Sequence, residues 1–221
     1  MTFFQKSFPA FFKALAKNNT TAWFDDHRKT YETEVKNPFE AFTREMIARI
    51  GALDAEVKIA PKDAMSRINR DTRFSADKNP YNTHLSCSIS KYGKASREYP
   101  GIHFKLSHAG IGVFGGAYAP EPPTLAKIRA LIAKDGKALA KATASKPFVA
   151  HFGELRGESM KRVPPELQAA VAKDPRIAMK QLWYQADLPA SLITSSELCD
   201  VLMAHWKAGR DVNVFLQRAF V

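Results

Sequence analysis

The first sixty residues repeat apolar side chains with the 3.6-residue period of amphipathic helices. The pair Asn18-Asn19 interrupts the first helix, a second helix is predicted over about 21–35, and Gly51 ends a third. Ser7 is the expected N-cap of the first helix and Asn37 that of the third. The first apolar stripe could lie on a membrane surface, but a helix docked on the core is the commoner arrangement. The stripe comprises Phe4, Phe8, Phe11, Phe12 and Leu15.

The middle of the chain changes to two-residue alternation, which is typical of half-buried strands. Residues 85–92 and 102–107 alternate apolar and polar side chains, and 111–114 follow a short turn that contains Gly110. The last two segments therefore predict a β-hairpin. A first strand is expected near Met65–Asn69, so that the whole region forms a mostly antiparallel sheet.

Helical periodicity returns in the last hundred residues. One helix is predicted over 121–144, whereas the proline-rich stretch 148–190 reads as irregular apart from a short strand near its end. A last helix is predicted over 195–207, with Gly209 as its end, and 211–220 is a candidate for one more.

These patterns predict an α+β fold, with N-terminal helices packed on a mostly antiparallel sheet and further C-terminal helices. The 221 residues are 45% hydrophobic and contain 15 Phe, which is enough for a sizeable core. We find no internal repeat and no linker composition. The chain is therefore expected to be a single domain over 1–221, helical over 1–60, mainly β over 61–120 and mainly α over 121–221.

The net charge of +11 favours anionic partners, such as phosphorylated small molecules, nucleic acid or an anionic membrane surface. The alternative is a solvated basic surface without a partner. No apolar run is long enough to span a membrane, so no membrane insertion is expected. Cys87 and Cys199 lack metal-ligand spacing, and no secretory signal is evident. A cytoplasmic protein with reduced thiols is expected, and its oligomeric state stays open.

The densest polar segment runs from Arg67 to His84. Three arginines, Arg67, Arg70 and Arg73, stand three residues apart and are followed by turn-forming residues, which predict a loop. Arginine binds phosphate and carboxylate groups through two parallel hydrogen bonds. We therefore expect a ligand site here, and the alternative is an Arg–Asp network that only fixes the loop.

Arg70 is the expected centre of this segment. If residues 66–71 form a strand, Arg70 shares the packed face with Ile68 and must be paired, because an unpaired buried guanidinium is costly. Asp71 would point away on such a strand, so Asp77 on the returning loop is the better partner. The residues expected to stay free at the rim, where they would receive an anion, are Arg67, Arg73, Lys78 and the hydroxyl of Tyr81.

Other candidates are weaker. His84 could act as a general base, since histidine titrates near neutrality, although such residues more often only donate structural hydrogen bonds. Trp23, Phe24 and His27 lie within about one helical turn of Arg28 and could stack a base or a sugar, but aromatic residues at that spacing are more often part of the core. The histidines have no zinc-site spacing, so we expect neither a metal nor a cofactor.

The polar segment resembles the signature of an uncharacterised family of bacterial and fungal proteins, the domain of unknown function numbered 2461. The matching residues are Arg67-Ile-x-Arg70-Asp71-x-Arg73-Phe74-Ser75-x-Asp77-Lys78-x-Pro80-Tyr81. Further matches are Asn18-Asn19, Trp23-Phe24 with Arg28 and Tyr31, Pro38-Phe39, Pro100-Gly101, Gly115-Gly116 with Tyr118, and Lys161-Arg162-Val163-Pro164. The chain departs from the family pattern after Pro164, where Pro165-Glu166 replaces Lys-Gly. The resemblance implies a shared fold and a shared site around Arg70–Tyr81, and it implies no activity.

Three functions remain open at this stage. The first is a site for a phosphate- or carboxylate-bearing small ligand, with or without catalysis. The second is a nucleic-acid-associated protein that uses the same cluster and a basic helix at 124–146. The third is a structural or interaction module. Convergence of the arginines on a pocket would favour the first, a long basic stripe the second, and complete pairing to acids the third.

Overall fold

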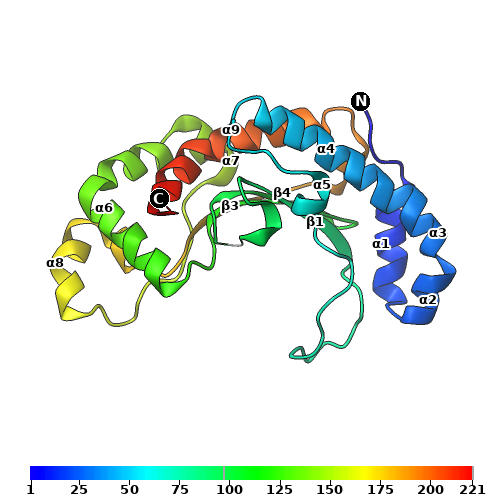
Figure 1. Cartoon of the computed structure of the whole chain (residues 1–221), viewed down its shortest axis with the longest axis horizontal. Coiled ribbons are helices and arrows are strands. Elements are labelled where there is room, and N and C mark those ends of the chain that lie inside the picture. The colour runs from blue at the N-terminus through cyan, green and yellow to red at the C-terminus, as the bar shows by residue number, and fades with distance from the viewer. Residues whose placement is uncertain (97, 221) are drawn as a thin grey trace. The chain divides into compact units, whose positions relative to one another are not determined.

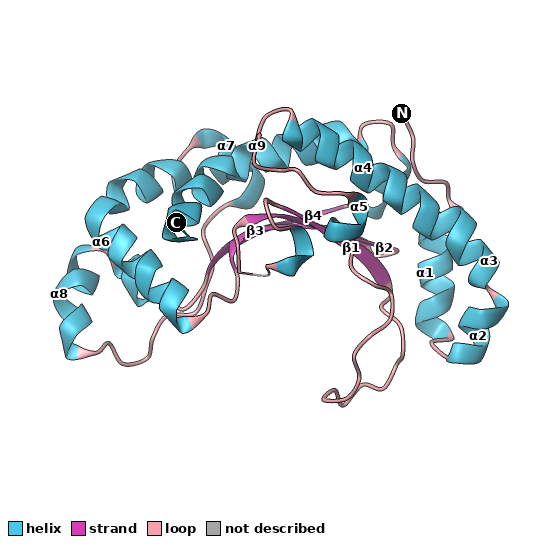
Figure 2. Ribbon diagram, viewed as in Figure 1, coloured by secondary structure: helices cyan, strands magenta, loops and turns pink. Residues whose placement is uncertain are grey.

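The computed structural model describes residues 1–96 and 98–220 (Figures 1 and 2). The helices are α1 (Ser7–Lys17), α2 (Thr21–Asp26), α3 (Arg28–Thr30), α4 (Asn37–Gly51), α5 (Pro61–Ala64), α6 (Pro122–Thr143), α7 (Lys146–Phe152), α8 (Pro165–Lys173) and α9 (Leu198–Gln217). A π-helical segment, Tyr31–Lys36, joins α3 to α4. The strands are β1 (His84–Ile89), β2 (Gly101–Ser107), β3 (Gly110–Ala117) and β4 (Leu182–Leu188).

The predicted α+β class is confirmed. The four strands form one antiparallel sheet in the order β1-β2-β3-β4, and the expected β2–β3 hairpin is present. The residues cluster into two compact units. Unit 1 comprises Met1–Ala95, His103–Val113 and Asp187–Met203, and unit 2 comprises Ser96–Ile102, Phe114–Ala186 and Ala204–Val221.

The core of unit 1 forms between the N-terminal helices and the apolar face of β1 and β2. Phe8 and Phe12 of α1 are fully buried, so the first apolar stripe is core rather than a membrane surface. Phe42 of α4 lies 6.4 Å from Phe104 of β2, measured between ring centroids. The alternation predicted for β1 holds as well, since Cys87 is fully buried on the side that faces the core.

Two predicted helix caps in unit 1 are wrong. The side chain of Ser7 caps nothing, because α1 starts at Ser7 itself. Asn37 has helical backbone angles and continues the π-helical segment directly into α4. This continuity buries Tyr31, Val35 and Phe39 along one side, which outweighs a capped restart at Asn37. The predicted helix over 21–35 is instead divided near His27.

The strand expected near Met65–Asn69 is not continuous. This segment runs antiparallel to the chain that leads into β1, but it pairs only through isolated bridges, Met65 with Cys87 and Asn69 with Tyr81. The two bridges are four positions apart on one side, from 65 to 69, and six positions apart on the other, from 81 to 87, so the pairing shifts between them. Such a bulge interrupts a regular ladder.

Unit 2 contains the largest departures from prediction. The stretch predicted as irregular includes α7 and α8. Helix α9 passes straight through Gly209, which was expected to end a helix. A glycine stands at this helical position because the ring of Tyr184 packs against it. That ring is fully buried, and its hydroxyl donates to the Gly209 carbonyl at 3.3 Å. A side chain at Gly209 or at Gly115 would overlap this ring.

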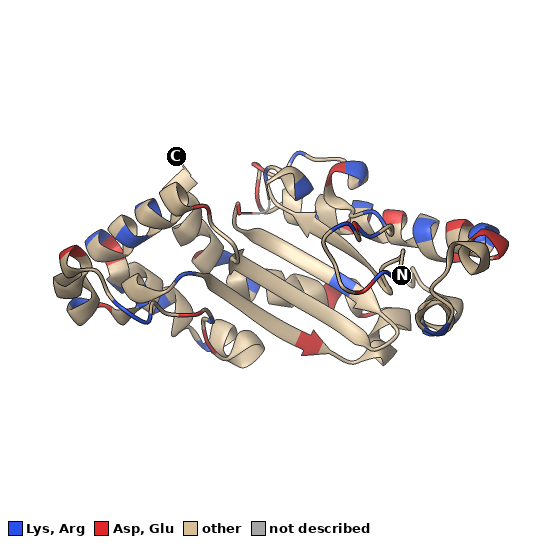
Figure 3. Cartoon of the chain, turned by 90° about the horizontal axis from the view of Figure 1, so that it is seen from below, with Lys and Arg blue, Asp and Glu red and all other residues tan. Residues whose placement is uncertain are grey.

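Both cysteines, Cys87 and Cys199, are free and buried, which confirms that they form no disulfide. Among the described residues, no helix has the length and apolar character needed to cross a bilayer. Charged residues concentrate on the helices and loops, whereas the strands carry few (Figure 3).

Candidate functional site

The candidate segment forms a long loop that we call the arm, residues 66–83. It belongs to unit 1, starts beside β1 and extends away from the strand (Figures 1 and 2). Backbone hydrogen bonds join its two sides: Ser66 N to Ser86 O at 2.9 Å, Asn82 N to Ile68 O at 2.8 Å, and Arg70 N to Pro80 O at 2.8 Å. These bonds define a paired stem and a tip, residues 71–79. The backbone groups that form these bonds in the stem are satisfied without burial in the core.

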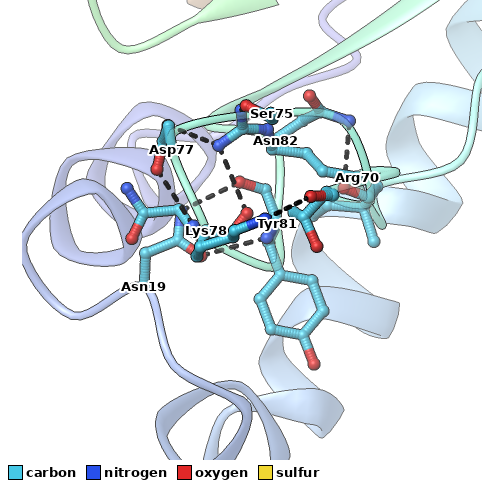
Figure 4. Close-up of polar contacts among 10 residues, drawn as sticks. Asn19, Arg70, Ser75, Asp77, Lys78, Tyr81 and Asn82 are labelled. Atoms are coloured by element: carbon cyan, nitrogen blue, oxygen red, sulfur yellow. Dashed lines mark hydrogen bonds and ion pairs between the residues drawn. The ribbon is translucent and has the colours of Figure 1, made fainter.

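Arg70 cross-links the tip (Figure 4). Its guanidinium donates from Nη1 to Asp77 Oδ2 at 2.5 Å and to the Asn79 carbonyl at 3.2 Å. The predicted Arg70–Asp77 pair is therefore present, but it is not buried: the two side chains are 22% and 54% exposed. A backbone hydrogen bond from Asn79 and then the Arg70 guanidinium lower the pKa of Asp77. The pair fixes the shape of the arm and is not part of the core.

The remaining cations of the arm differ in how they are held. Arg73 was expected to be free, but it forms a two-pronged pair with Asp71, from Nε to Oδ1 at 3.0 Å and from Nη2 to Oδ2 at 2.7 Å. Adjacency in sequence allows this contact, because the tip is a turn and not a strand. Lys78 donates to the Thr72 carbonyl at 3.0 Å and has no carboxylate partner among the residues that the structure describes. Arg67 is exposed, and within residues 1–96 and 98–220 its guanidinium makes no ion pair.

Tyr81 was expected to present its hydroxyl to an anion at the rim. Its ring instead points away from Arg70, Asp77 and Lys78 (Figure 4) and is 5% exposed. It stacks on Phe24 with the ring centroids 4.1 Å apart. The hydroxyl of Tyr81 is therefore not placed among the cations of the arm.

Asn19 holds the base of the arm, a role that the sequence did not indicate. Its side-chain Oδ1 accepts from the Tyr81 backbone N–H at 3.1 Å, and its Nδ2 donates to the Tyr81 carbonyl at 2.9 Å (Figure 4). Together with the Phe24–Tyr81 stack, this clamp joins the turn before α2 to the arm. The only signal available was the co-occurrence of the two segments in one family signature.

The aromatic group at α2 is largely self-contained. Trp23 stacks on His27 with ring centroids 3.9 Å apart and an interplanar angle of 13°. Arg28 pairs with Asp25, and its guanidinium carbon lies 5.5 Å above the Phe24 ring. The ring faces that could receive a base or sugar are thus partly occupied by neighbouring side chains.

His84 lies on β1 beside a second histidine. Burial, followed by the charges of Lys105 and His103, lowers the pKa of His84 to about 4. Burial and Lys105 lower the pKa of His103 to about 4 as well. Nδ1 of His103 lies 2.9 Å from the Ser88 hydroxyl. Both imidazoles are neutral near pH 7, and a histidine with so low a pKa is a weak general base.

The described residues include no cluster of three or more His, Cys, Asp or Glu side chains arranged to hold a metal ion. The most exposed aromatic ring of the arm is Phe74, at 95%, with the Arg73 guanidinium carbon 5.8 Å from its centroid. The tip therefore presents an exposed apolar ring beside a guanidinium.

The fold and the arm define the chain as a basic α+β protein with a polar loop fixed on one edge of an antiparallel sheet. The chain matches the model of the family described as "Conserved hypothetical protein (DUF2461)" over residues 7–215 and belongs to that family. This confirms the family suggested by the arm motif. No curated protein and no solved structure matches the chain.

Proposed function

We propose that the arm binds a phosphate- or carboxylate-bearing ligand. Four cations, Arg67, Arg70, Arg73 and Lys78, stand on the arm with only two carboxylates, Asp71 and Asp77. The observation that carries the proposal is the exposed Arg67 guanidinium, which makes no ion pair within the described residues. A cation without a partner, on a loop held in one shape, is suited to receive an anion.

The three cations of the arm that already have partners differ in how readily they could turn to a ligand. Lys78 would exchange one carbonyl contact for a charged one, which is a stronger hydrogen bond. The Arg73–Asp71 pair is exposed, with side chains 77% and 42% accessible, and such pairs contribute little net stability. Arg70 keeps its ion pair with Asp77, which holds the site in one shape.

Calorimetric titration with pyrophosphate, citrate and ATP tests the proposal. Arg67→Ala and Lys78→Ala should each weaken binding of the best ligand about tenfold, because one charge-assisted hydrogen bond contributes about 1.5–3 kcal/mol. Arg44→Ala is the control, since it removes an exposed arginine that lies outside the arm and is paired with Glu40 at 2.9 Å. If both arm variants bind every anion as the parent does, the proposal fails.

Nucleic acid is the second candidate ligand, and Phe74 is the observation that favours it. An exposed ring with a guanidinium beside it, on a loop that carries further cations, is suited to stack an unpaired base while the backbone phosphates are neutralised. Phe74→Ala should then weaken binding of a short oligothymidylate several-fold without affecting pyrophosphate. Equal loss for both ligands, or for neither, would argue against base stacking. The salt dependence of oligothymidylate binding would give the number of phosphate contacts.

We also propose that the protein works in the cytoplasm. The support is the pair of free cysteines, which suits a reducing compartment.

A further inference from the structure

A second cluster with binding chemistry lies in unit 2, and it involves none of the residues of the arm. Trp183 of β4 meets Tyr118, which directly follows β3, edge to face, with ring centroids 5.5 Å apart and an interplanar angle of 78°. The Arg156 guanidinium carbon lies 5.8 Å from the Trp183 centroid. We call Tyr118, Arg156 and Trp183 the aromatic corner.

The backbone fixes the corner. Arg156 and Trp183 exchange two backbone hydrogen bonds, Arg156 N to Trp183 O at 2.6 Å and Trp183 N to Arg156 O at 3.0 Å. The next residue, Gly157, has φ +155° and passes so close to the Gln181 carbonyl that a side chain would collide with it. The Trp183 ring and the Arg156 guanidinium therefore project from paired backbone segments, as a preorganised site requires, and Tyr118 directly follows β3.

Two side chains of the aromatic corner have a ring or a charge that the packing of the fold does not require. Tyr118 is 61% exposed, although it sits where the neighbouring Ala117 is fully buried. In the part of the chain that the structure describes, the Arg156 guanidinium makes no ion pair, and it lies near the Trp183 ring. Glu158, two residues along, is already paired with Lys180 at 3.7 Å. Lys161 and Arg162 follow shortly after, so segment 156–162 carries an excess of cations.

We propose that the aromatic corner binds a nucleotide-like ligand, whose planar ring stacks on Trp183 or Tyr118 and whose phosphate pairs with Arg156. Aromatic rings bind planar ligands by stacking, and a free guanidinium prefers a phosphate. Arg156 also argues against a cationic ligand, because the positive charge that lies over Trp183 would repel a quaternary ammonium group. A neutral sugar would leave the guanidinium without its preferred partner.

Tryptophan fluorescence gives a local readout of this site, because Trp183 is one of only three tryptophans in the chain. Adenosine 5′-monophosphate should quench the emission saturably. Adenosine, which lacks the phosphate, and ribose 5-phosphate, which lacks the ring, should each bind at least tenfold more weakly. Trp183→Phe should abolish the quench even though the other two tryptophans remain.

Three variants then separate the contributions, with binding measured by calorimetry and folding by thermal melts. Arg156→Ala should weaken the monophosphate at least tenfold but leave adenosine unchanged, and Arg156→Lys should recover part of the loss. Tyr118→Ala should weaken both ligands. Tyr92→Ala is the matched control, because Tyr92 is also an exposed tyrosine, 46% accessible, with a lysine 5.7 Å from its ring.

Two results would overturn the inference. One is binding of ribose 5-phosphate as tight as that of the monophosphate, which would make stacking irrelevant. The other is unchanged binding by folded Arg156→Ala and Tyr118→Ala proteins, which would place any nucleotide elsewhere. Neither result bears on the arm, because that proposal is tested by variants of different residues, Arg67 and Lys78.

Discussion

Lowering the pH from 6.5 to 4 should destabilise the protein by several kcal/mol through His84 and His103. Both have a pKa of about 4 in the folded state, against 6.5 for an ordinary histidine, chiefly because they are buried. Between pH 4 and 6.5 the unfolded chain therefore binds protons that the folded chain does not. The free energy of unfolding rises with pH across this window and falls as the pH is lowered.

The size of the effect follows from the shift in pKa. One pKa unit corresponds to about 1.4 kcal/mol, and partial exposure reduces the full value, so roughly 2 kcal/mol for each histidine is expected. Urea unfolding of His84→Gln and His103→Gln at pH 4.5 and 7 measures it. Each variant should lose less stability on acidification than the parent.

His151→Gln, on α7, is the control for removal of a histidine at another position. The comparison between parent and variant also cancels the acid titration of aspartates, which both proteins share. A parent and a double variant with identical pH dependence would show that the histidines are not buried in solution.

The side chains on either face of β1 and β2 were predictable, but their burial was not. Alternation over residues 85–92 placed Cys87 among the apolar positions, and the structure buries it. The opposite face of an antiparallel sheet commonly meets water, and His84 and His103 lie on that face. Its histidines are nevertheless substantially buried, because burial depends on what the neighbouring segments cover, and local periodicity carries no such information.

The arm shows a similar division between local and long-range information. The partnership of Arg70 with Asp77 follows from charge and turn chemistry within ten residues, and it is present. The Asn19 clamp on Tyr81 joins positions 62 residues apart, and no pattern in a single sequence identifies such a pair. The prediction for Arg73 was wrong because Asp71 was placed at the end of a strand, pointing away. The chain turns at Asp71 instead, and this turn lets Arg73 reach the Asp71 carboxylate.

Several residues that carry the family resemblance in unit 2 are explained by packing. The side chain of Asn213 on α9 accepts from the Gly116 backbone N–H and donates to the Gly101 carbonyl, both at 3.0 Å. Gly115 leaves room for the ring of Tyr184. These glycines allow the close packing of α9. Tyr118, in contrast, is exposed and has no such structural explanation. The contrast separates scaffold from candidate site within one signature.

Gly209→Ala should destabilise the protein by about 1–3 kcal/mol, the range for overpacking a well-filled core. Taken alone, alanine in the middle of a helix is favoured over glycine by about 1 kcal/mol. The sequence pattern reads Gly209 as a helix end, in which case alanine would do little harm to the packing. The structure predicts the opposite, because the new methyl group would overlap the buried ring of Tyr184.

A double-mutant cycle with Tyr184→Leu tests this cause directly. Leucine removes the aromatic ring beside Gly209, so the added methyl group should find room in that background. Gly209→Ala should then be neutral or should stabilise by up to about 1 kcal/mol, as helix propensity alone dictates. The coupling energy between the two positions, measured by urea unfolding, should therefore be about 1–4 kcal/mol. An equal loss in both backgrounds would mean that Gly209 is required for another reason, and no loss in either would restore its reading as a mere helix end.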